Sequence, residues 1–254
     1  MELENKVIWI TGASSGIGRA LAVQLAQENT VIASGRCWEK LLQLKEEVPE
    51  IVIRQADVTQ PSELAYTCRF IEQLFGKLDM LIANAGHCEY MDVRHFDSSI
   101  AWRMMETNYM GFVYSLEASL PLLRRAESPH IVAMSSSSVF AGLPRAEAYS
   151  ASKAAISQFM ESLAADLKPE GFNLSVIHPG FVDTDLTRHN DFPMPLIMTP
   201  DKAAKRIIRG IAREQFSIDF PRTLTWLLRC LKSTPFFVRH RITGSLSRNA
   251  QHEL

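Results

Sequence analysis

The chain has 254 residues, of which 46% are hydrophobic and 22% charged, and its formal net charge at pH 7 is −1. These values are typical of a globular protein, and a charge near zero argues against nucleic acid as the main partner. No apolar stretch approaches the roughly 20 residues that cross a bilayer, and no basic signal region opens the chain, so we expect a cytoplasmic protein. The cysteines have neither CxxC spacing nor a histidine cluster, so we predict no metal site and reduced, mostly buried thiols at Cys37, Cys68, Cys88 and Cys230.

Short apolar runs alternate along the chain with longer amphipathic segments. The runs predict six strands, at 7–10, 30–34, 51–53, 78–83, 130–134 and 173–177. Helices are expected between them, at 20–25, around 41–44, at 64–75, at about 98–123, and through Tyr149 to Leu167. Uninterrupted apolar strands indicate burial on both faces, and alternation of strand with helix indicates parallel pairing. The sequence therefore predicts an α/β fold with a doubly wound parallel sheet, three layers and a single domain.

A glycine-rich turn follows the first predicted strand and leads directly into a helix. It reads Thr11-Gly12-Ala13-Ser14-Ser15-Gly16-Ile17-Gly18. Three glycines allow a tight turn and a close approach of the backbone to a pyrophosphate, and the N–H groups at the helix N-terminus then bind the anion. A plain glycine-rich turn is the alternative, but the position between strand and helix favours nucleotide binding.

Tyr149 and Lys153 lie four residues apart in a predicted helix, so their side chains share one face. An ammonium beside a phenol stabilises the phenolate and lowers the phenol pKa from about 10 toward working pH. Such a phenol is suited to acid/base catalysis. The same spacing also occurs by chance on surface helices, so the pair gains its meaning from the motifs that precede it.

Further motifs stand at the ends of the predicted elements. Asp57-Val58 follows the third strand, Asn84-Ala85-Gly86 follows the fourth, and Asn108 lies in the long helix at 98–123. Ser136 is thirteen residues before Tyr149, and the run from Pro179 to Thr184 follows the sixth strand. With these motifs, residues 5–212 resemble the single-domain short-chain dehydrogenases/reductases, a Rossmann-like family whose first loop reads Thr-Gly-x-x-x-Gly-x-Gly. The resemblance implies hydride transfer between a nicotinamide and a carbonyl or alcohol carbon.

The resemblance also implies a role for each catalytic residue. Tyr149 would give a proton to the carbonyl oxygen, and Lys153 would lower its pKa and contact the nicotinamide ribose. Ser136 would fix the substrate oxygen, and Asn108 would hold a water that links Lys153 to solvent. As alternatives, Ser136 could belong to a solvated serine loop, and Asn108 could satisfy a neighbouring carbonyl. The implied cofactor contacts are Gly12, Ser14, Ser15, Gly16, Ile17, Gly18, Arg36, Asp57, Val58, Asn84, Ala85, Gly86, Tyr149, Lys153, Pro179, Gly180, Val182 and Thr184.

The end of the second strand indicates which cofactor binds. An NAD site usually places an acid there, about twenty residues beyond the glycines, to bind the ribose 2′-OH. This chain has Arg36 and no acid in residues 33–37. An arginine can bind a 2′-phosphate through two hydrogen bonds, so we predict NADP(H) rather than NAD(H). Against this, Ser15 stands where many NADP-dependent relatives carry a basic residue, and Arg36 could simply face solvent.

Three segments near the ends of the strands are expected to form the substrate walls, at 87–93, 139–144 and 181–198. Their apolar side chains predict a hydrophobic ketone, aldehyde or secondary alcohol as substrate: Tyr90, Met91, Val139, Phe140, Leu143, Phe181, Phe192, Met194, Leu196 and Met198. The histidines His87, His130 and His178 are given no catalytic role. A non-catalytic, cofactor-sensing protein of the same fold is the alternative, but such proteins usually lose the active-site Tyr or Lys.

The last part of the chain differs in charge from the rest. No Asp or Glu occurs from Phe220 to His252, whereas the basic residues there are Arg222, Arg229, Lys232, Arg239, Arg241 and Arg248. We therefore divide the chain into a catalytic domain at 1–219 and a basic, apolar extension at 220–254. The extension could form a lid or a subunit interface, or contact a membrane surface through residues 220–248. The family resemblance implies a homodimer or homotetramer.

Overall fold

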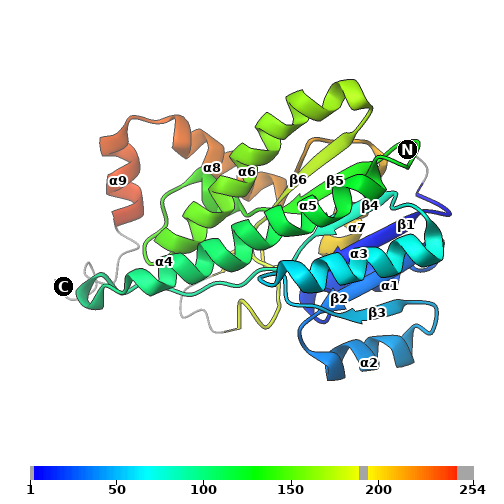
Figure 1. The fold of residues 1–254 in the computed structure, drawn as a ribbon. Helices are drawn as coiled ribbons and strands as arrows, with labels where there is room; N and C mark the ends of the chain where they lie inside the picture. Colours follow the sequence, from blue (N-terminus) through cyan, green and yellow to red (C-terminus); the bar gives the residue numbers. More distant parts are fainter. Residues whose placement is uncertain (1–2, 189–193, 245–254) are drawn as a thin grey trace.

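The computed structural model describes residues 3–188 and 194–244. Seven parallel strands form one sheet in the order β3-β2-β1-β4-β5-β6-β7 (Figure 1). The strands are β1 Val7–Thr11, β2 Thr30–Gly35, β3 Val52–Gln55, β4 Met80–Ala83, β5 His130–Met134, β6 Asn173–Pro179 and β7 Ser217–Phe220. The order reverses between β1 and β4, which makes the sheet doubly wound. The predicted fold class is confirmed.

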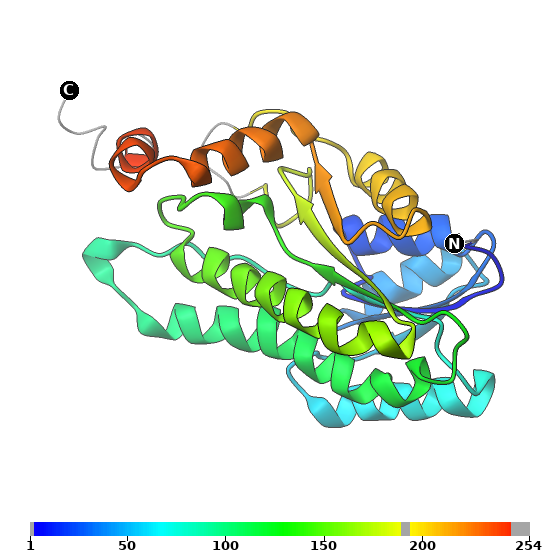
Figure 2. The same cartoon turned by 90° about the horizontal axis from the view of Figure 1, so that it is seen from above.

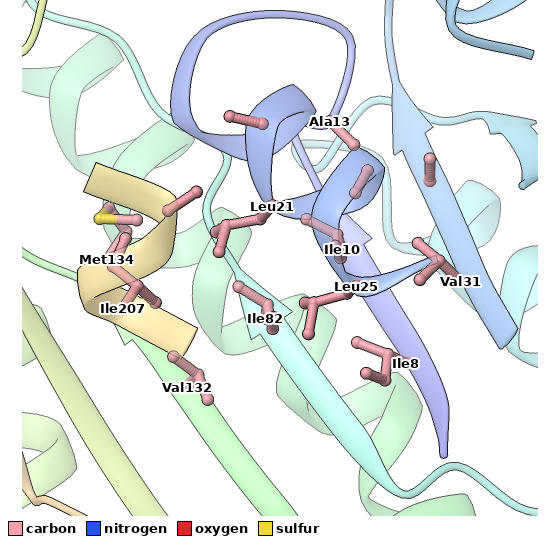
Figure 3. Close-up of a cluster of buried hydrophobic side chains, with 14 of the residues drawn as sticks. Ile8, Ile10, Ala13, Leu21, Leu25, Val31, Ile82, Val132, Met134 and Ile207 are labelled. Carbon is pink, nitrogen blue, oxygen red and sulfur yellow. The ribbon is translucent and has the colours of Figure 1, made fainter. Parts of the chain in front are cut away.

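Helices cover both faces of the sheet, as Figure 2 shows from above. One layer contains α3 Pro61–Phe75, α5 Gly111–Leu123 and α6 Glu147–Leu167. The other contains α1 Gly16–Leu25, α2 Trp38–Glu47 and α7 Pro200–Ala212. Between this second layer and the strands lies a buried hydrophobic cluster that includes Ile10, Leu21, Ile82 and Ile207 (Figure 3). Burial on both faces explains why the strands are apolar without alternation.

The long helix expected at 98–123 is continuous, but one segment has a wider winding. It consists of α4 Ser98–Met104, the π-helical segment η2 Met105–Met110, and α5. Asp97 caps its N-terminus, because its side chain accepts a hydrogen bond from the Ser99 N–H. Asn108 lies in η2. Short π-helical segments occur often at functional sites, and nothing in the local sequence predicted this one.

The seventh strand was missing from our prediction. Residues 217–220 form β7, which pairs with β6 at the edge of the sheet, so Phe220 belongs to the sheet rather than to the extension. Two helices follow, α8 Arg222–Ser233 and α9 Phe236–Gly244 (Figure 1). Within residues 3–188 and 194–244, no helix combines the length and the apolar character of a membrane span. Arg248 lies outside the described residues.

Of the four cysteines only Cys68 is buried, so the expectation of mostly buried thiols was wrong. Cys37 and Cys88 are half-buried, and Cys230 is exposed on α8. All four are free thiols.

Candidate active site

A cleft of about 330 Å³ opens at the carboxyl ends of the strands. Its lining includes every predicted cofactor contact except Gly18, together with Ser136. Gly18 lies beneath the cleft, where a Cβ would come within 2.3 Å of the Gly12 carbonyl oxygen. The structure thus gathers along one cleft residues that the sequence spreads from Gly12 to Thr184.

The glycine loop after β1 is held against the end of β4. Asn84 Nδ2 donates to the carbonyl oxygens of Thr11 at 3.1 Å and Gly12 at 3.0 Å. Gly12 has a φ of +65°, and a Cβ there would lie 2.7 Å from the Cα of Ala85. Only glycine fits at this position, because a side chain would meet backbone as well as require a left-handed conformation. The loop leaves a cradle that suits a pyrophosphate.

Two cations stand at the far end of the cleft. Arg36 follows β2, has a side chain 69% exposed, and lies 3.9 Å from a carboxylate oxygen of Asp57. Lys40, one helical turn later, lines the cleft and forms an ion pair of 3.0 Å with Asp185. Our sequence analysis missed Lys40, although its spacing from Arg36 is a visible signal. Both cations line the same cleft as the glycine loop.

Three of the four predicted catalytic residues come from helix α6 and from the loop that follows β5. Lys153, on α6, is buried and donates from Nζ to the carbonyl oxygen of Met134 at 2.8 Å. Its Nζ lies 6.0 Å from the centre of the Tyr149 ring. Ser136, which follows β5, forms a side-chain hydrogen bond with Tyr149. Three of the four predicted catalytic side chains therefore line one end of the cleft.

Burial controls the ionisation of this cluster. It raises the pKa of the Tyr149 phenol, an effect that the hydrogen bond with Ser136 only partly offsets. We predicted the opposite direction, and that prediction was wrong because loss of hydration is the largest influence on the phenol. Burial also lowers the pKa of Lys153 to about 8. The phenol is consequently protonated at neutral pH.

Asn108 does not line the cleft, and its amide is engaged by backbone. Its Oδ1 accepts from the His87 N–H at 2.9 Å, and its Nδ2 donates to the His87 carbonyl at 3.0 Å and to Ser152 Oγ at 2.9 Å. Asn108 thus satisfies the neighbouring His87 carbonyl, and its role in catalysis stays a prediction. A Cβ on Gly86 would lie 2.9 Å from Asn108 Oδ1 and 3.1 Å from Lys153 Nζ, so both side chains flank that glycine.

The predicted substrate walls are only partly placed beside the cleft. Met91 and Phe140 are buried in the protein, and Arg145 stacks on the ring of Tyr90 at 4.8 Å. Leu196 is 56% exposed. Phe192 lies outside the described residues. The cleft lining contains none of the ten predicted apolar wall residues, but it does contain His87, from the first predicted wall segment, and Thr107, which the sequence analysis did not assign to it.

With this geometry established, comparison with known proteins decides the family. The family model described as short chain dehydrogenase matches residues 6–192. The chain belongs to the short-chain dehydrogenase family. It is 35% identical over 239 residues to a Myxococcus xanthus protein named "Uncharacterized oxidoreductase", covering 92% of this chain and 94% of that protein. It is 31% identical over 250 residues to the 11-beta-hydroxysteroid dehydrogenase A of Sesamum indicum, covering 96% of this chain and 67% of that protein.

Solved structures of short-chain dehydrogenases share the fold. One from Burkholderia cenocepacia J2315, in complex with NADP, has a TM-score of 0.83 at 24% identity and covers 96% of this chain and 99% of that one. Another from Burkholderia phymatum, in complex with NAD, has a TM-score of 0.82 at 22% identity and covers 90% and 93%. This short-chain dehydrogenase is thus an oxidoreductase of a family whose members bind NAD or NADP and act on CH–OH and C=O groups. The residues present fit such a dinucleotide, because the glycine loop and the cations Arg36 and Lys40 line one cleft.

Proposed function

We propose that the protein is an NADP(H)-preferring oxidoreductase that interconverts a hydrophobic ketone or aldehyde and the corresponding alcohol. The observation that carries this proposal is that Ser136 and Tyr149 line the same cleft as the glycine loop. Lys153 stands at the same end of the cleft. A proton donor and a dinucleotide cradle in one cleft suit carbonyl reduction.

The nicotinamide, when bound, supplies or accepts the hydride, and the protein orients the reactants and manages the proton. Tyr149, protonated at neutral pH, gives its proton to the substrate oxygen during reduction. Ser136 donates a hydrogen bond to the same oxygen and so fixes its distance from the phenol. Lys153 places a positive charge near the phenolate that remains. The reverse sequence of proton movements serves alcohol oxidation.

A tyrosine substitution tests the catalytic proposal. Tyr149→Phe should leave the Kd for NADPH within about twofold, because the glycine loop is unchanged, while kcat falls by a factor on the order of 10²–10⁴. Tyr66→Phe is the matched control, since Tyr66 is 59% exposed on α3. The assay is NADPH absorbance with a panel of hydrophobic ketones, aldehydes and alcohols. Undiminished turnover by Tyr149→Phe would rule out the assigned role.

The cofactor preference rests on Arg36 and on the absence of an acid at the end of β2. The exposed guanidinium, 3.9 Å from Asp57, is free to turn toward a 2′-phosphate. Arg36→Leu should weaken NADPH binding by about tenfold, the effect of one charge-assisted contact, and leave NADH binding nearly unchanged. Titration of cofactor fluorescence measures both. Equal losses for the two cofactors would contradict the proposal.

The packing of the extension supports the interpretation that it forms a lid above the substrate region. Lys232 on α8 donates to the Val139 carbonyl at 3.3 Å, and a Cβ on Gly180 would meet Pro221 and Leu224 at 2.9 and 3.0 Å. Helix α8 therefore packs on two segments that we expect to border the substrate. The proposed substrate, a small hydrophobic carbonyl or alcohol, binds beneath this lid. We also propose that the protein forms a homodimer or homotetramer, as the family resemblance implies.

Exposed aromatic side chains support peripheral membrane contact as an additional property of the extension. Trp226 is 68%, Phe236 69% and Phe237 73% exposed, in a region without acids. Aromatic and basic side chains together favour an anionic lipid interface. Trp226→Ser should reduce co-sedimentation with phosphatidylglycerol vesicles at low salt, whereas Trp102→Ser, at a site 70% exposed on α4, should not. Absence of wild-type binding would exclude membrane contact.

A further inference from the structure

A series of hydrogen-bonded polar side chains, which we call the relay, connects the C-terminal extension to the helix that carries Tyr149. It begins on α8 at Arg229, whose Nη2 donates to Oδ2 of Asp219 at 2.8 Å. Asp219, on β7, lies 2.9 Å through Oδ1 from Nδ1 of His178 on β6. The other ring nitrogen of His178 is 3.2 Å from Oγ of Ser157 on α6. Three hydrogen bonds thus link α8 to α6.

The relay continues from Ser157 to the backbone next to Ser136 and Lys153. Ser157 Oγ lies 2.7 Å from Ser135 Oγ and 3.2 Å from the carbonyl oxygen of Lys153. Ser135 Oγ donates to that same carbonyl at 2.9 Å, and the Ser135 N–H donates to Ile177 at 2.8 Å. Ser135 is therefore held between β6 and α6. The next residue is Ser136, the hydrogen-bond partner of Tyr149.

Helix α8 also covers the segment that follows Ser136. The guanidinium carbon of Arg229 lies 4.1 Å from the centre of the Phe140 ring, in the short helix η3 Ser137–Phe140. The centre of the Phe140 ring also lies 4.9 Å from that of the His178 ring. The same arginine thus contacts both the relay and the segment next to the catalytic serine.

The charges of the relay residues determine which group donates and which accepts each hydrogen bond. Burial by itself would raise the pKa of the Asp219 carboxyl, but hydrogen bonds from His178 and Ser217 outweigh burial and hold it below its usual range. An ionised carboxylate accepts the Nδ1–H of His178. In the neutral imidazole this leaves Nε2 as an acceptor for the Ser157 hydroxyl. The single hydroxyl proton of Ser135 is then shared between Ser157 Oγ at 2.7 Å and the Lys153 carbonyl oxygen at 2.9 Å.

We propose that Ser157, His178, Asp219 and Arg229 are positioning residues, which couple helix α8 to the placement of Ser136 and of the Lys153 turn. The proposal rests on the oxidoreductase function proposed above. The relay ends on the carbonyl of Lys153 and not on its Nζ. It therefore orients the active site and does not deliver protons to the amine. The extension is accordingly part of the support of the active site as well as its cover.

The connectivity of Ser157, His178 and Asp219 is also that of an acyl-transfer triad, but the surroundings do not suit a nucleophile. Ser157 lines neither the cofactor cleft nor the second described cavity, which lies between η3, α6 and α9. Its hydroxyl also contacts the Lys153 carbonyl of its own helix. A positioning role uses all of these contacts, whereas nucleophilic attack would need space for a substrate.

Removing one hydroxyl tests the relay. Ser157→Ala should lower kcat by about five- to tenfold, the loss of roughly one hydrogen bond, with KM for NADPH unchanged. Ser157→Thr keeps a hydroxyl and should restore kcat. Ser162→Ala is the matched control, because the Ser162 hydroxyl also bonds the carbonyl four residues earlier on α6 but is exposed and outside the relay. Equal kcat values for Ser157→Ala and Ser162→Ala would overturn the proposal.

A double-mutant cycle tests whether the two ends communicate. Arg229→Leu alone should lower kcat, and adding Ser157→Ala should lower it little further, because both changes break one relay. Independent sites would instead give the product of the two single losses, which would refute coupling.

Hydrogen exchange provides a readout that needs no turnover. Amides at 134–140 should exchange faster in Ser157→Ala and in Arg229→Leu than in the wild type or Ser162→Ala. If the oxidoreductase proposal fails, no variant will show turnover, but this exchange pattern will still decide the relay. Unchanged exchange in both relay variants would refute it.

Discussion

Replacing Lys153 by methionine should remove a pH dependence of stability that burial of its amine creates. The residue is 3% exposed, and among the described residues no carboxylate forms an ion pair with it. Its Nζ donates to the Met134 carbonyl oxygen at 2.8 Å. Burial lowers the pKa of Lys153 from 10.5 to about 8. The folded protein therefore releases this proton at a lower pH than the unfolded chain does.

The sign of the effect follows from proton binding in the two states. Below pH 8 both states carry the ammonium, so the fold bears the full cost of its desolvation. As the pH rises from about 8 toward 10.5, only the folded state loses the proton, and the destabilisation disappears. The gap between the two pKa values corresponds to roughly 3 kcal/mol, of which about 2–3 kcal/mol should be recovered between pH 7 and pH 10.

Urea unfolding of wild type and Lys153→Met at pH 7 and pH 10 measures this change. The stability of the variant relative to the wild type should fall by roughly 2–3 kcal/mol between the two pH values, and the subtraction cancels the titrating groups that do not interact with Lys153. Lys205→Met, an exposed site on α7, is the control and should show no such change. The same difference at both pH values would refute the argument from burial.

Three further substitutions have expected outcomes. Gly18→Ala would bring a Cβ within 2.3 Å of the Gly12 carbonyl oxygen and should weaken NADPH binding by about tenfold or more. Gly142→Ala is the control and should not weaken binding, because there is open space around Gly142. Calorimetric titration measures the Kd for NADPH of both variants. Asn84→Ala removes two hydrogen bonds to the glycine loop and should raise the Kd for NADPH in the same titration. Ser34→Ala leaves the buried Trp9 indole N–H without its 2.9 Å acceptor and should cost about 1–3 kcal/mol in urea unfolding.

Part of the candidate site could be predicted because its motifs are formed by residues close together in the sequence. The glycine loop and the Tyr149–Lys153 spacing are each contained in a few consecutive residues, and their geometry follows from backbone rules. The seventh strand could not be predicted in the same way. Residues 217–220 include Ser217 and Asp219, so their polar character hides an edge strand that is defined only by pairing with β6.

The pKa of Tyr149 shows a second limit of sequence analysis. Four-residue spacing places Lys153 on the same helix face, but it does not determine how deeply the phenol is buried. In the structure burial dominates and raises the pKa, against our prediction. The hydrogen bonds of Asn108 and the relay to Arg229 are also invisible in sequence, because their partners come from distant strands and helices.

The sequence by itself determined the first six strands, most of the helices between them and the glycine loop after β1, since apolar periodicity and backbone chemistry act over short stretches of chain. Only the tertiary structure decided the ionisation of Tyr149 and Lys153, the engagement of Asn108 and the placement of Arg229. Those properties depend on solvent exclusion and on contacts between segments far apart along the chain, and both exist only after the sheet and its two helix layers have packed.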